Sequence, residues 1–502
     1  MIMAMRLVKF ISKYRLEATN FVVGAVVLTY ELTATRITAP YIGTTIYVWT
    51  SIIGVILASL AIGYWAGGYM ADARKKPLDV LMLLILAASC IMLTIYSKDR
   101  TLSFIGETVW PLQLQALTAS LILFAPATIV LGSISPYLAR LSIHTLSNSG
   151  QHLGRISAAG TVGSLFGTFL TGFWLFGVIG TRYILGVLVI CLLLTTFLVT
   201  IKELVWERVG LIVIAAIALG LPPSVHLPGI VTKDTDSSYN RLLVRDVQTT
   251  TQGKLRVLQI DSRHWQSAVY GDGRPGLVFN YIQFFASSAA LNPQATHFLV
   301  IGGGAFTLPA YLAKTYPQAQ VDVVEIDGKL QTISADYFGF KQPKNLRIIT
   351  ADGRQFLNKN QQAYDMIFVD AFTSLSPPFQ LATVQAVSRL ASSLSADGLV
   401  VLNLDTSLNT QGLKYISSIK NTFGQSFPNI EIYKIQTDIR PENEQNILLI
   451  AGKKAVAPRV QQLASRDPAY KKTINSLGID GSKGNVLTDD FAPVEQLVAG
   501  QL

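Results

Sequence analysis

Short segments of glycine or carboxylate residues follow apolar runs at four places in the second half of the chain. They are Gly302, Gly303 and Gly304; Glu325; Asp352 with Gly353; and Asp370. Glycines lack a Cβ atom, so the backbone of such a turn can approach a ligand closely. Glu325 follows the glycines at about the spacing at which an acidic side chain binds ribose hydroxyls, and together they predict a nucleoside-type cofactor.

The two remaining segments extend this candidate site. The Asp352 carboxylate could accept a hydrogen bond from the exocyclic amine of an adenine. A single aspartate at the end of a strand, such as Asp370, is more often a helix cap than a catalyst. Because Asp370 coincides with three other strand-end motifs, we interpret it as the catalytic residue.

A parallel sheet would bring these segments together. From His297 onward, apolar runs alternate with segments of helical pattern; the runs are 298–301, 321–326, 347–350, 366–369, 399–402, 430–435 and 447–451. This alternation predicts a mostly parallel sheet with helices on both faces, an α/β Rossmann-like fold of the class I methyltransferase type. Ligands of such sheets bind at the carboxyl ends of the strands, where all four segments lie.

A smaller element precedes this fold. Residues 240–245 and 255–260 alternate apolar and polar side chains, with Gly253 in the connecting turn, and they predict a small antiparallel β segment. We therefore divide the soluble half into a β-rich segment, residues 234–290, and a cofactor-binding catalytic domain, residues 291–502.

The first half of the chain is apolar enough to lie in a lipid bilayer. Only 14% of all residues are charged, and the mean hydropathy is +0.40. A spanning helix needs about 20 apolar residues, and residues 1–222 contain six such runs, near 18–38, 46–70, 78–97, 114–138, 157–179 and 182–201. A seventh run, 209–221, is short, so this transmembrane helical domain has six or seven spans.

The loop charges predict the orientation. One set of loops carries eleven basic residues and the other carries four, which places the N-terminus on the cytoplasmic side of a bacterial-type cell membrane. The side of the catalytic domain stays undecided, because it depends on the seventh run. Glu31 and Arg36 lie in or at the end of the first span, where costly ionisable groups indicate either a structural pair or a ligand site.

Two classes of function are disfavoured. The soluble half has no basic cluster interleaved with aromatic residues, so we expect no nucleic-acid partner. The five histidines are scattered without metal-ligand spacing, so we expect no metal site.

An ordered set of strings in this chain resembles the spermidine synthase family of aminopropyltransferases, in its bacterial branch fused to a multi-span membrane module. The strings are Ser238-Tyr-Asn240, Leu258-Gln-Ile-Asp-Ser262, Gln266, Tyr281, the glycine turn, Glu325-Ile-Asp327, Asp352-Gly353 and Tyr364-Asp365 with Asp370. The β-rich segment before the sheet distinguishes this family from generic methyltransferases.

The resemblance implies transfer of an aminopropyl group from decarboxylated S-adenosylmethionine, a co-substrate and not a permanently bound cofactor, to a small amine such as putrescine. Asp370 would accept the proton of the amine, Glu325 would bind the ribose, and Asp352 the adenine. Gln266 would border the cavity on the donor side. Tyr239, Tyr281 and Thr373 would contact the amine. The expected partners are this amine and the lipid bilayer, and the fold allows a homodimer.

Three positions depart from the family pattern. Ala305 stands where the family has an acidic residue after the glycines, Thr373 where one follows the catalytic aspartate, and Gln283 where a glutamate follows the cavity tyrosine. The absence of each charge-assisted hydrogen bond would weaken binding of a cationic amine by about 1.5–3 kcal/mol. The acceptor is therefore expected to differ from putrescine. An S-adenosylmethionine-dependent methyltransferase, or a non-catalytic transporter or sensor of polyamines or nucleosides, are the alternatives.

Overall fold

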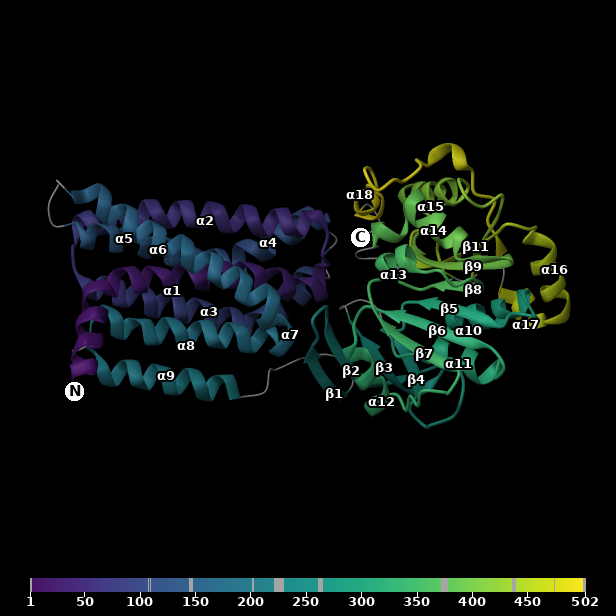
Figure 1. The fold of residues 1–502 in the computed structure, drawn as a ribbon, viewed down its shortest axis with the longest axis horizontal. Helices are drawn as coiled ribbons and strands as arrows, with labels where there is room; N and C mark the ends of the chain where they lie inside the picture. The colour runs from purple at the N-terminus through teal and green to yellow at the C-terminus, as the bar shows by residue number, and fades with distance from the viewer. Residues whose placement is uncertain are drawn as a thin grey trace. The chain divides into compact units, whose positions relative to one another are not determined.

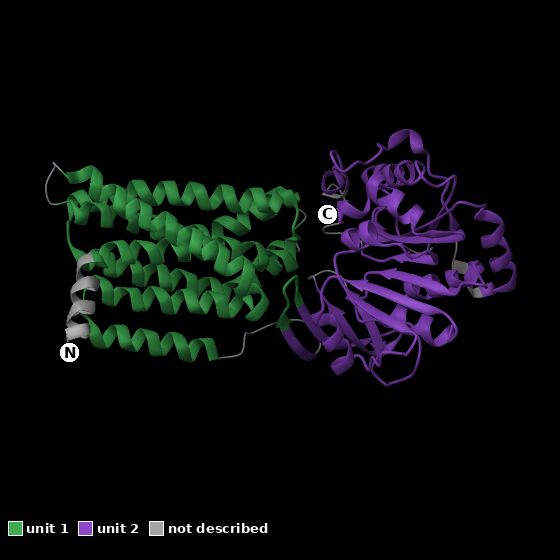
Figure 2. Ribbon diagram, in the orientation of Figure 1, with its two compact units in different colours: residues 1–226, 235–241 green, residues 227–234, 242–502 purple. Residues whose placement is uncertain are grey.

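The structure, a computed structural model, describes residues 2–106, 108, 110–143, 148–200, 203–220, 230–260, 265–371, 378–435, 439–473 and 475–499. The chain forms two compact units (Figures 1 and 2). The first comprises residues 1–226 and 235–241, and the second comprises residues 227–234 and 242–502.

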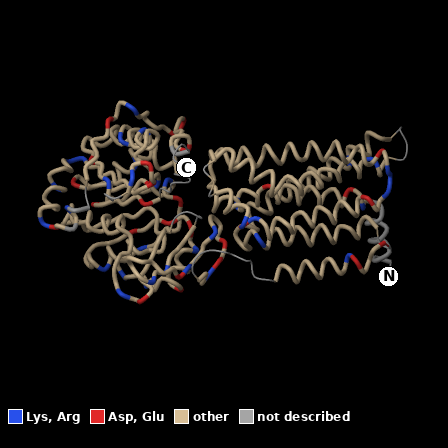
Figure 3. Tube along the Cα trace, turned by 180° about the vertical axis from the view of Figure 1, so that it is seen from behind, with Lys and Arg blue, Asp and Glu red and all other residues tan. Residues whose placement is uncertain are grey.

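The first unit is a helical bundle. Its helices are α1 (Ile2–Ile42), α2 (Ile46–Ala73), α3 (Pro77–Gly106), α4 (Leu112–Leu123), α5 (Ala125–Ser142), α6 (Ser149–Leu170), α7 (Phe176–Val178), α8 (Thr181–Val199) and α9 (Val205–Gly220). Among the described residues, five helices are long and apolar enough to cross a membrane, or six if the bent pair α4 and α5 is one span. Charged residues lie mainly near the two ends of the bundle (Figure 3), a distribution typical of helices that span a membrane.

Glycines let the backbones of neighbouring helices approach closely. A Cβ atom at Gly163 of α6 would lie 1.9 Å from the Phe21 carbonyl oxygen of α1, and one at Gly67 of α2 would lie 2.1 Å from the Ser133 carbonyl oxygen of α5. Without a hydrophobic force between helices in lipid, such close packing is a main source of their association. The pairs α1–α6 and α2–α5 are therefore fixed by small residues.

Helix α9 carries the chain from one end of this bundle to the other. Near its start, Arg208 donates to the carbonyl oxygens of Thr196 and Thr200 at the end of α8, at 3.1 and 2.8 Å. Near its end, the Ala218 carbonyl accepts from Tyr96, at 2.6 Å, and from Arg182 at the start of α8, at 3.4 Å. Helix α9 thus runs antiparallel to α8. With 16 residues it is about 24 Å long, which is shorter than the other candidate spans.

The segment 235–241 is bound at the end of the same bundle where α8 starts and α9 ends. Arg36 of α1 donates to the Ser237 carbonyl oxygen at 2.9 Å and also to that of Ser238. Asp236 accepts from the backbone N–H of Thr181 at 2.6 Å. Arg36 is therefore a structural anchor for this segment through backbone carbonyls, which is a role that the sequence analysis did not predict.

The second unit contains two sheets. The small one has the order β1-β2-β3-β4, with β1 (Ile230–Asp236), β2 (Arg241–Thr249), β3 (Gly253–Gln259) and β4 (Trp265–Tyr270). Strands β2, β3 and β4 pair antiparallel, and Gly253 starts β3 at a φ of +76°. The predicted small antiparallel element is confirmed.

The large sheet has the order β12-β10-β11-β9-β8-β5-β6-β7. Its strands are β5 (His297–Ile301), β6 (Gln320–Glu325), β7 (Leu346–Thr350), β8 (Tyr364–Val369), β9 (Leu394–Thr406), β10 (Asn429–Lys434), β11 (Gln445–Gly452) and β12 (Asn475–Ser476). Every predicted strand coincides with one of these. The order reverses at β5, which pairs with both β6 and β8, and ligands of such sheets bind beside this point.

The expectation of a mostly parallel sheet is correct for β5 to β9 only. Strands β7, β6, β5, β8 and β9 are parallel to one another, whereas β11 pairs antiparallel with both β9 and β10. Only about ten residues connect β10 to β11, and a parallel crossover needs a dozen or more. The short connection therefore forces the mixed sheet.

Helices cover both faces of this sheet, as the alternation predicted. One face packs on α10 (Asn280–Ser288), α11 (Thr307–Thr315), α12 (Lys329–Tyr337), α16 (Ala457–Arg466) and α17 (Pro468–Thr473). The other packs on α13 (Gly353–Lys359), α14 (Val384–Ser392), α15 (Thr410–Phe423) and α18 (Val494–Ala499). Successive residues of β5 alternate between the two cores, Phe298 and Val300 in one, Leu299 and Ile301 in the other, which fixes the register of the central strand.

Candidate active site

The glycine turn leaves β5 at the point where the strand order reverses. Gly302 has a φ of +97°, and a Cβ atom there would lie 2.4 Å from the Asp370 carbonyl oxygen. Gly304 has a φ of +51°, and Phe306, the N-cap residue before α11, has a φ of +56°. Side chains other than hydrogen are excluded at Gly302 by both conformation and contact, so the turn stays open above the strand.

Glu325, the last residue of β6, braces this turn. One carboxylate oxygen accepts from the backbone N–H groups of Gly303 and Gly304 at 2.7 and 3.3 Å, and the other accepts from that of Asp327 at 2.9 Å. Burial raises the pKa of Glu325, although these three N–H groups lower it. A carboxylate has about four acceptor positions, and three of them accept from these N–H groups, so about one remains for a ribose hydroxyl.

The small sheet contributes directly to the turn. The Ser267 hydroxyl of β4 accepts from the Ala305 backbone N–H at 3.0 Å. A Cβ atom at Gly304 would lie 2.7 Å from the Ser267 hydroxyl oxygen and 4.0 Å from Cγ of Gln266. The structure thus brings Gln266 to the glycine turn, as its predicted place on the donor side requires.

Asp352 and Gly353 follow β7. The Asp352 side chain caps α13 by accepting from the Gln355 backbone N–H at 2.8 Å. A Cβ atom at Gly353 would lie 2.8 Å from Cγ2 of Ile301, the last residue of β5. Asp352 therefore has a structural role as a helix cap, beside the predicted contact with adenine.

Asp370 follows β8 directly and lies next to the glycine turn. Its backbone N–H donates to the Ile301 carbonyl oxygen at 2.8 Å, and its carboxylate accepts from the Asn403 side chain at 3.0 Å. Burial raises the pKa of Asp370 to about 6; the Asn403 hydrogen bond lowers it and the nearby Asp405 carboxylate raises it further. Asp370 is therefore a base that ionises just below neutral pH, which suits proton transfer.

Tyr281 of α10 belongs to the same group of side chains. Its hydroxyl donates to the Gln266 carbonyl oxygen at 3.3 Å. Burial raises its pKa well above the usual value, and the charges of Asp370 and Asp405 add to this shift. Tyr281 is thus a neutral hydrogen-bonding group that faces two carboxylates.

Sequence reasoning missed Asn403 and Asp405 of β9, together with Ser267. Asn403 accepts from the Asn446 side chain of β11 at 3.2 Å, so a chain of amides orients the Asp370 carboxylate. Asn403 and Asp405 are polar residues at alternate positions near the carboxyl end of an apolar strand. That pattern, beside the strand that ends at Asp370, was the signal available in the sequence.

Gln283 does not join this group of side chains. Gln283 is two residues from Tyr281 on α10, which places it on a different helix face; it is exposed, and its side chain donates to the Leu277 carbonyl oxygen at 2.7 Å. Tyr239 lies in the first unit, with its side chain about half exposed. Thr373 lies outside the described residues.

The strand order and the strand-end carboxylates define a Rossmann-like domain, a fold whose ligands bind at this edge of the sheet. Residues 282–459 match the family described as the spermine/spermidine synthase domain. Residues 282–459 of this chain therefore belong to a spermine/spermidine synthase domain, which confirms the resemblance predicted from its motifs.

Individual proteins show the same similarity. A Bifidobacterium longum protein named "Probable polyamine aminopropyl transferase" is 26% identical over 284 residues, which cover 52% of this chain and 61% of that protein. The eEF1A lysine and N-terminal methyltransferase of Xenopus laevis is 26% identical over 256 residues, 42% of this chain and 36% of that protein. A solved structure of a probable spermidine synthase from Corynebacterium glutamicum, 18% identical, covers 53% of this chain and 98% of its own, with a TM-score of 0.45. This chain spans less than two thirds of the length of both curated relatives.

Proposed function

We propose that this chain is a membrane-anchored aminopropyltransferase that uses decarboxylated S-adenosylmethionine as donor and a small amine as acceptor. The observation that carries the proposal is Asp370, a partly buried carboxylate with a pKa of about 6, next to a glycine turn that is braced by Glu325. The spermine/spermidine synthase domain at residues 282–459 supports the donor and acceptor classes.

The reaction requires alignment and one proton acceptor. The lone pair of the acceptor nitrogen attacks the donor carbon that is bonded to the sulfonium sulfur. A C–N bond forms, the C–S bond breaks, and its electron pair stays on sulfur, which leaves as the neutral thioether methylthioadenosine. The nitrogen becomes a secondary ammonium, and its excess proton passes to the Asp370 carboxylate. Because the sulfonium is already a good leaving group, most of the rate gain comes from orientation and from keeping the nitrogen unprotonated.

Asp405 gives this site a second anionic group. Its charge acts on both Asp370 and Tyr281, so it lies close enough to interact with a cationic amine held between them. Asp405 of β9 therefore partly replaces the negative charges that Ala305 and Thr373 do not supply. A diamine with one ammonium group besides its reactive nitrogen fits this arrangement, so the charge of Asp405 removes part of the reason for expecting an acceptor other than putrescine.

Product analysis of the Asp370→Asn variant tests the catalytic role. We expect turnover to fall by about 10²- to 10⁴-fold, the usual contribution of a general base, while donor binding measured by calorimetry is retained. Asp397→Asn is the matched control, because Asp397 lies on β9 near its other end and pairs with the exposed Lys454. Equal turnover in wild type and Asp370→Asn refutes the catalytic role of Asp370, whereas the absence of product from both proteins would favour the non-catalytic alternative.

Methyl transfer from intact S-adenosylmethionine is the second candidate function. Ala305 lacks the carboxylate that would hold the aminopropyl ammonium, and the Xenopus laevis methyltransferase is similar over 42% of this chain. Calorimetry with both donors separates the two functions. Tighter binding of the intact donor overturns the aminopropyl assignment.

We also propose that the chain crosses the membrane seven times and that its N-terminus and its C-terminal half lie on opposite sides. The course of α9 along α8 and the anchoring of 235–241 by Arg36 and Thr181 support this. Loop charges put the N-terminal end in the cytoplasm, so the donor would be drawn from the other side. Protease accessibility of tags at both termini in sealed vesicles tests it, and two tags in one compartment exclude seven crossings. We also expect a homodimer, and a measurement of the molecular mass in detergent tests this prediction.

A further inference from the structure

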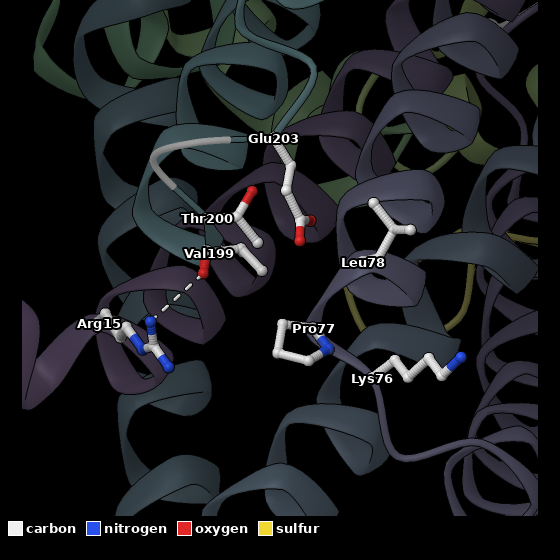
Figure 4. Close-up of a pocket in the computed structure, with 7 residues that line it drawn as sticks. All are labelled: Arg15, Lys76, Pro77, Leu78, Val199, Thr200 and Glu203. Carbon is white, nitrogen blue, oxygen red and sulfur yellow. Dashed lines mark hydrogen bonds between the residues drawn. The ribbon is translucent and has the colours of Figure 1, made fainter.

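Two cavities open at the end of the bundle where α1 starts its apolar stretch and α8 ends. Their volumes are about 380 and 520 Å³, and they share Arg15, Pro77 and Val199. The smaller one is drawn in Figure 4. Both are lined by residues of the first unit, and neither includes a residue of the candidate active site.

The larger cavity has an excess of basic side chains. Arg15, Lys75, Arg155 and His152 line it, against one carboxylate, Glu17. Arg155 already pairs with Glu17 at 2.5 Å. The smaller cavity adds Glu203, which Figure 4 shows on a different side from Arg15. The larger cavity therefore presents net positive charge even without a protonated histidine.

At this cavity, the cationic groups of Arg15 and Lys75 each donate one hydrogen bond to a backbone carbonyl oxygen at the end of a helix. Arg15 donates one N–H to the Val199 carbonyl oxygen at a long 3.5 Å, and Lys75 donates to the Ile143 carbonyl oxygen at 2.7 Å. A guanidinium has five N–H donors and an ammonium has three. Both groups can thus serve a further acceptor, and a phosphate with several charged oxygens matches such donors best.

Apart from Ser142, the remaining walls are apolar, which suits a lipid better than a fully hydrated anion. Leu16, Pro77, Leu141 and Val199 form them. At the same end of the bundle, Trp206 in the first turn of α9 exposes 84% of its surface. Tryptophan side chains of this kind gather at membrane interfaces. The cavity therefore lies at the depth of lipid headgroups.

We propose that the larger cavity is a binding site for a phosphate-bearing headgroup, with Arg15 and Lys75 donating to the phosphate oxygens and the apolar walls contacting the adjoining glycerol. The site is independent of the proposed enzymatic activity. Anionic lipids would bind more tightly than zwitterionic ones, because the cavity adds net positive charge to the phosphate contacts.

The test measures thermal unfolding of the full chain in detergent with increasing phosphatidylglycerol, phosphatidylcholine or inorganic phosphate. We expect phosphatidylglycerol to raise the unfolding temperature at a lower concentration than phosphatidylcholine. In Arg15→Gln or Lys75→Gln we expect roughly tenfold more phosphatidylglycerol to be needed for the same rise, because one charge-assisted hydrogen bond is removed. The control is Arg140→Gln, which removes an exposed arginine paired with Asp72 at the same end of the bundle but outside the cavity.

Each outcome decides the proposal. Stabilisation by inorganic phosphate that both variants weaken also supports the site and identifies free phosphate as its ligand. Equal responses to the two lipids, or an effect of Arg140→Gln as large as that of the other variants, overturn it. If a variant does not fold, native mass spectrometry of the wild type takes the place of the comparison. We expect prior exposure to high salt to release bound phosphatidylglycerol, and phosphatidylglycerol that stays bound contradicts an electrostatic site.

Discussion

The pH dependence of turnover should respond in opposite directions to two substitutions on β9. Asn403 stabilises the ionised form of Asp370 through a 3.0 Å hydrogen bond, and Asp405 destabilises it by charge repulsion. Asp370 must be ionised to accept a proton, so kcat/KM should fall as the pH decreases through its pKa of about 6. Asn403→Leu removes the hydrogen bond and should move this fall to higher pH. Asp405→Asn removes the repelling charge and should move it to lower pH.

The structure sets the size of both shifts. A hydrogen bond to a charged group contributes about 1.5–3 kcal/mol, and one pKa unit corresponds to about 1.4 kcal/mol, so the loss of Asn403 should raise the midpoint by about one to two units. Val369 pairs with Leu402, so Asp370 lies level with Asn403. Asp405 is two residues farther than Asn403 along this neighbouring strand, roughly 8 Å from Asp370. Two charges at this distance repel by about 2 kcal/mol at an effective dielectric constant of 20, and by less where water screens them. Asp405→Asn should therefore lower the midpoint by about one unit.

The assay is the pH profile of kcat/KM with one acceptor amine, for wild type, both variants and the Asp397→Asn control. Ionisation of the free amine contributes the same slope to all four profiles, so it cancels in the comparison. Shifts of the same sign in the two variants, or no shift in either, refute the role of Asp370 as the proton acceptor. A shift in the control shows a general charge effect instead of a local one.

Three further substitutions test the donor side of the site. Gly302→Ala combines a left-handed backbone with a Cβ atom 2.4 Å from the Asp370 carbonyl oxygen, so thermal unfolding should show a larger loss of stability than for Gly339→Ala, which has a φ of +65° but no atom within 4 Å and should lose only about 1–2 kcal/mol. Glu325→Gln removes one acceptor oxygen from the glycine turn and should weaken donor binding by roughly 10- to 100-fold in calorimetry; unchanged affinity contradicts its assignment to the ribose. Asp352→Asn keeps the helix cap, because Asn caps as well as Asp, so stability should be unchanged and donor affinity should fall; an unchanged affinity leaves Asp352 as a cap alone.

Local pattern was sufficient for much of this protein. Each strand from β5 to β11 is an apolar run bounded by polar or turn residues, and each bundle helix that could span a membrane is an apolar run of sufficient length. Gly302, Glu325, Asp352 and Asp370 could be assigned because each lies at, or within two residues after, the carboxyl end of a strand, and the ends of neighbouring parallel strands meet at one edge of the sheet. These properties depend only on neighbours in the sequence.

Only the tertiary structure determined which side chains change the pKa of Asp370 and at which end of the bundle α9 ends. Asn403 and Asp405 are separated from Asp370 by a helix and become its neighbours through the pairing of β8 with β9, which a sequence pattern does not specify. The direction of β11 and the course of α9 were likewise set by chain connections and packing. The free energy of an ionisable group depends on its surroundings in space, and those surroundings are formed by residues that are distant in the chain.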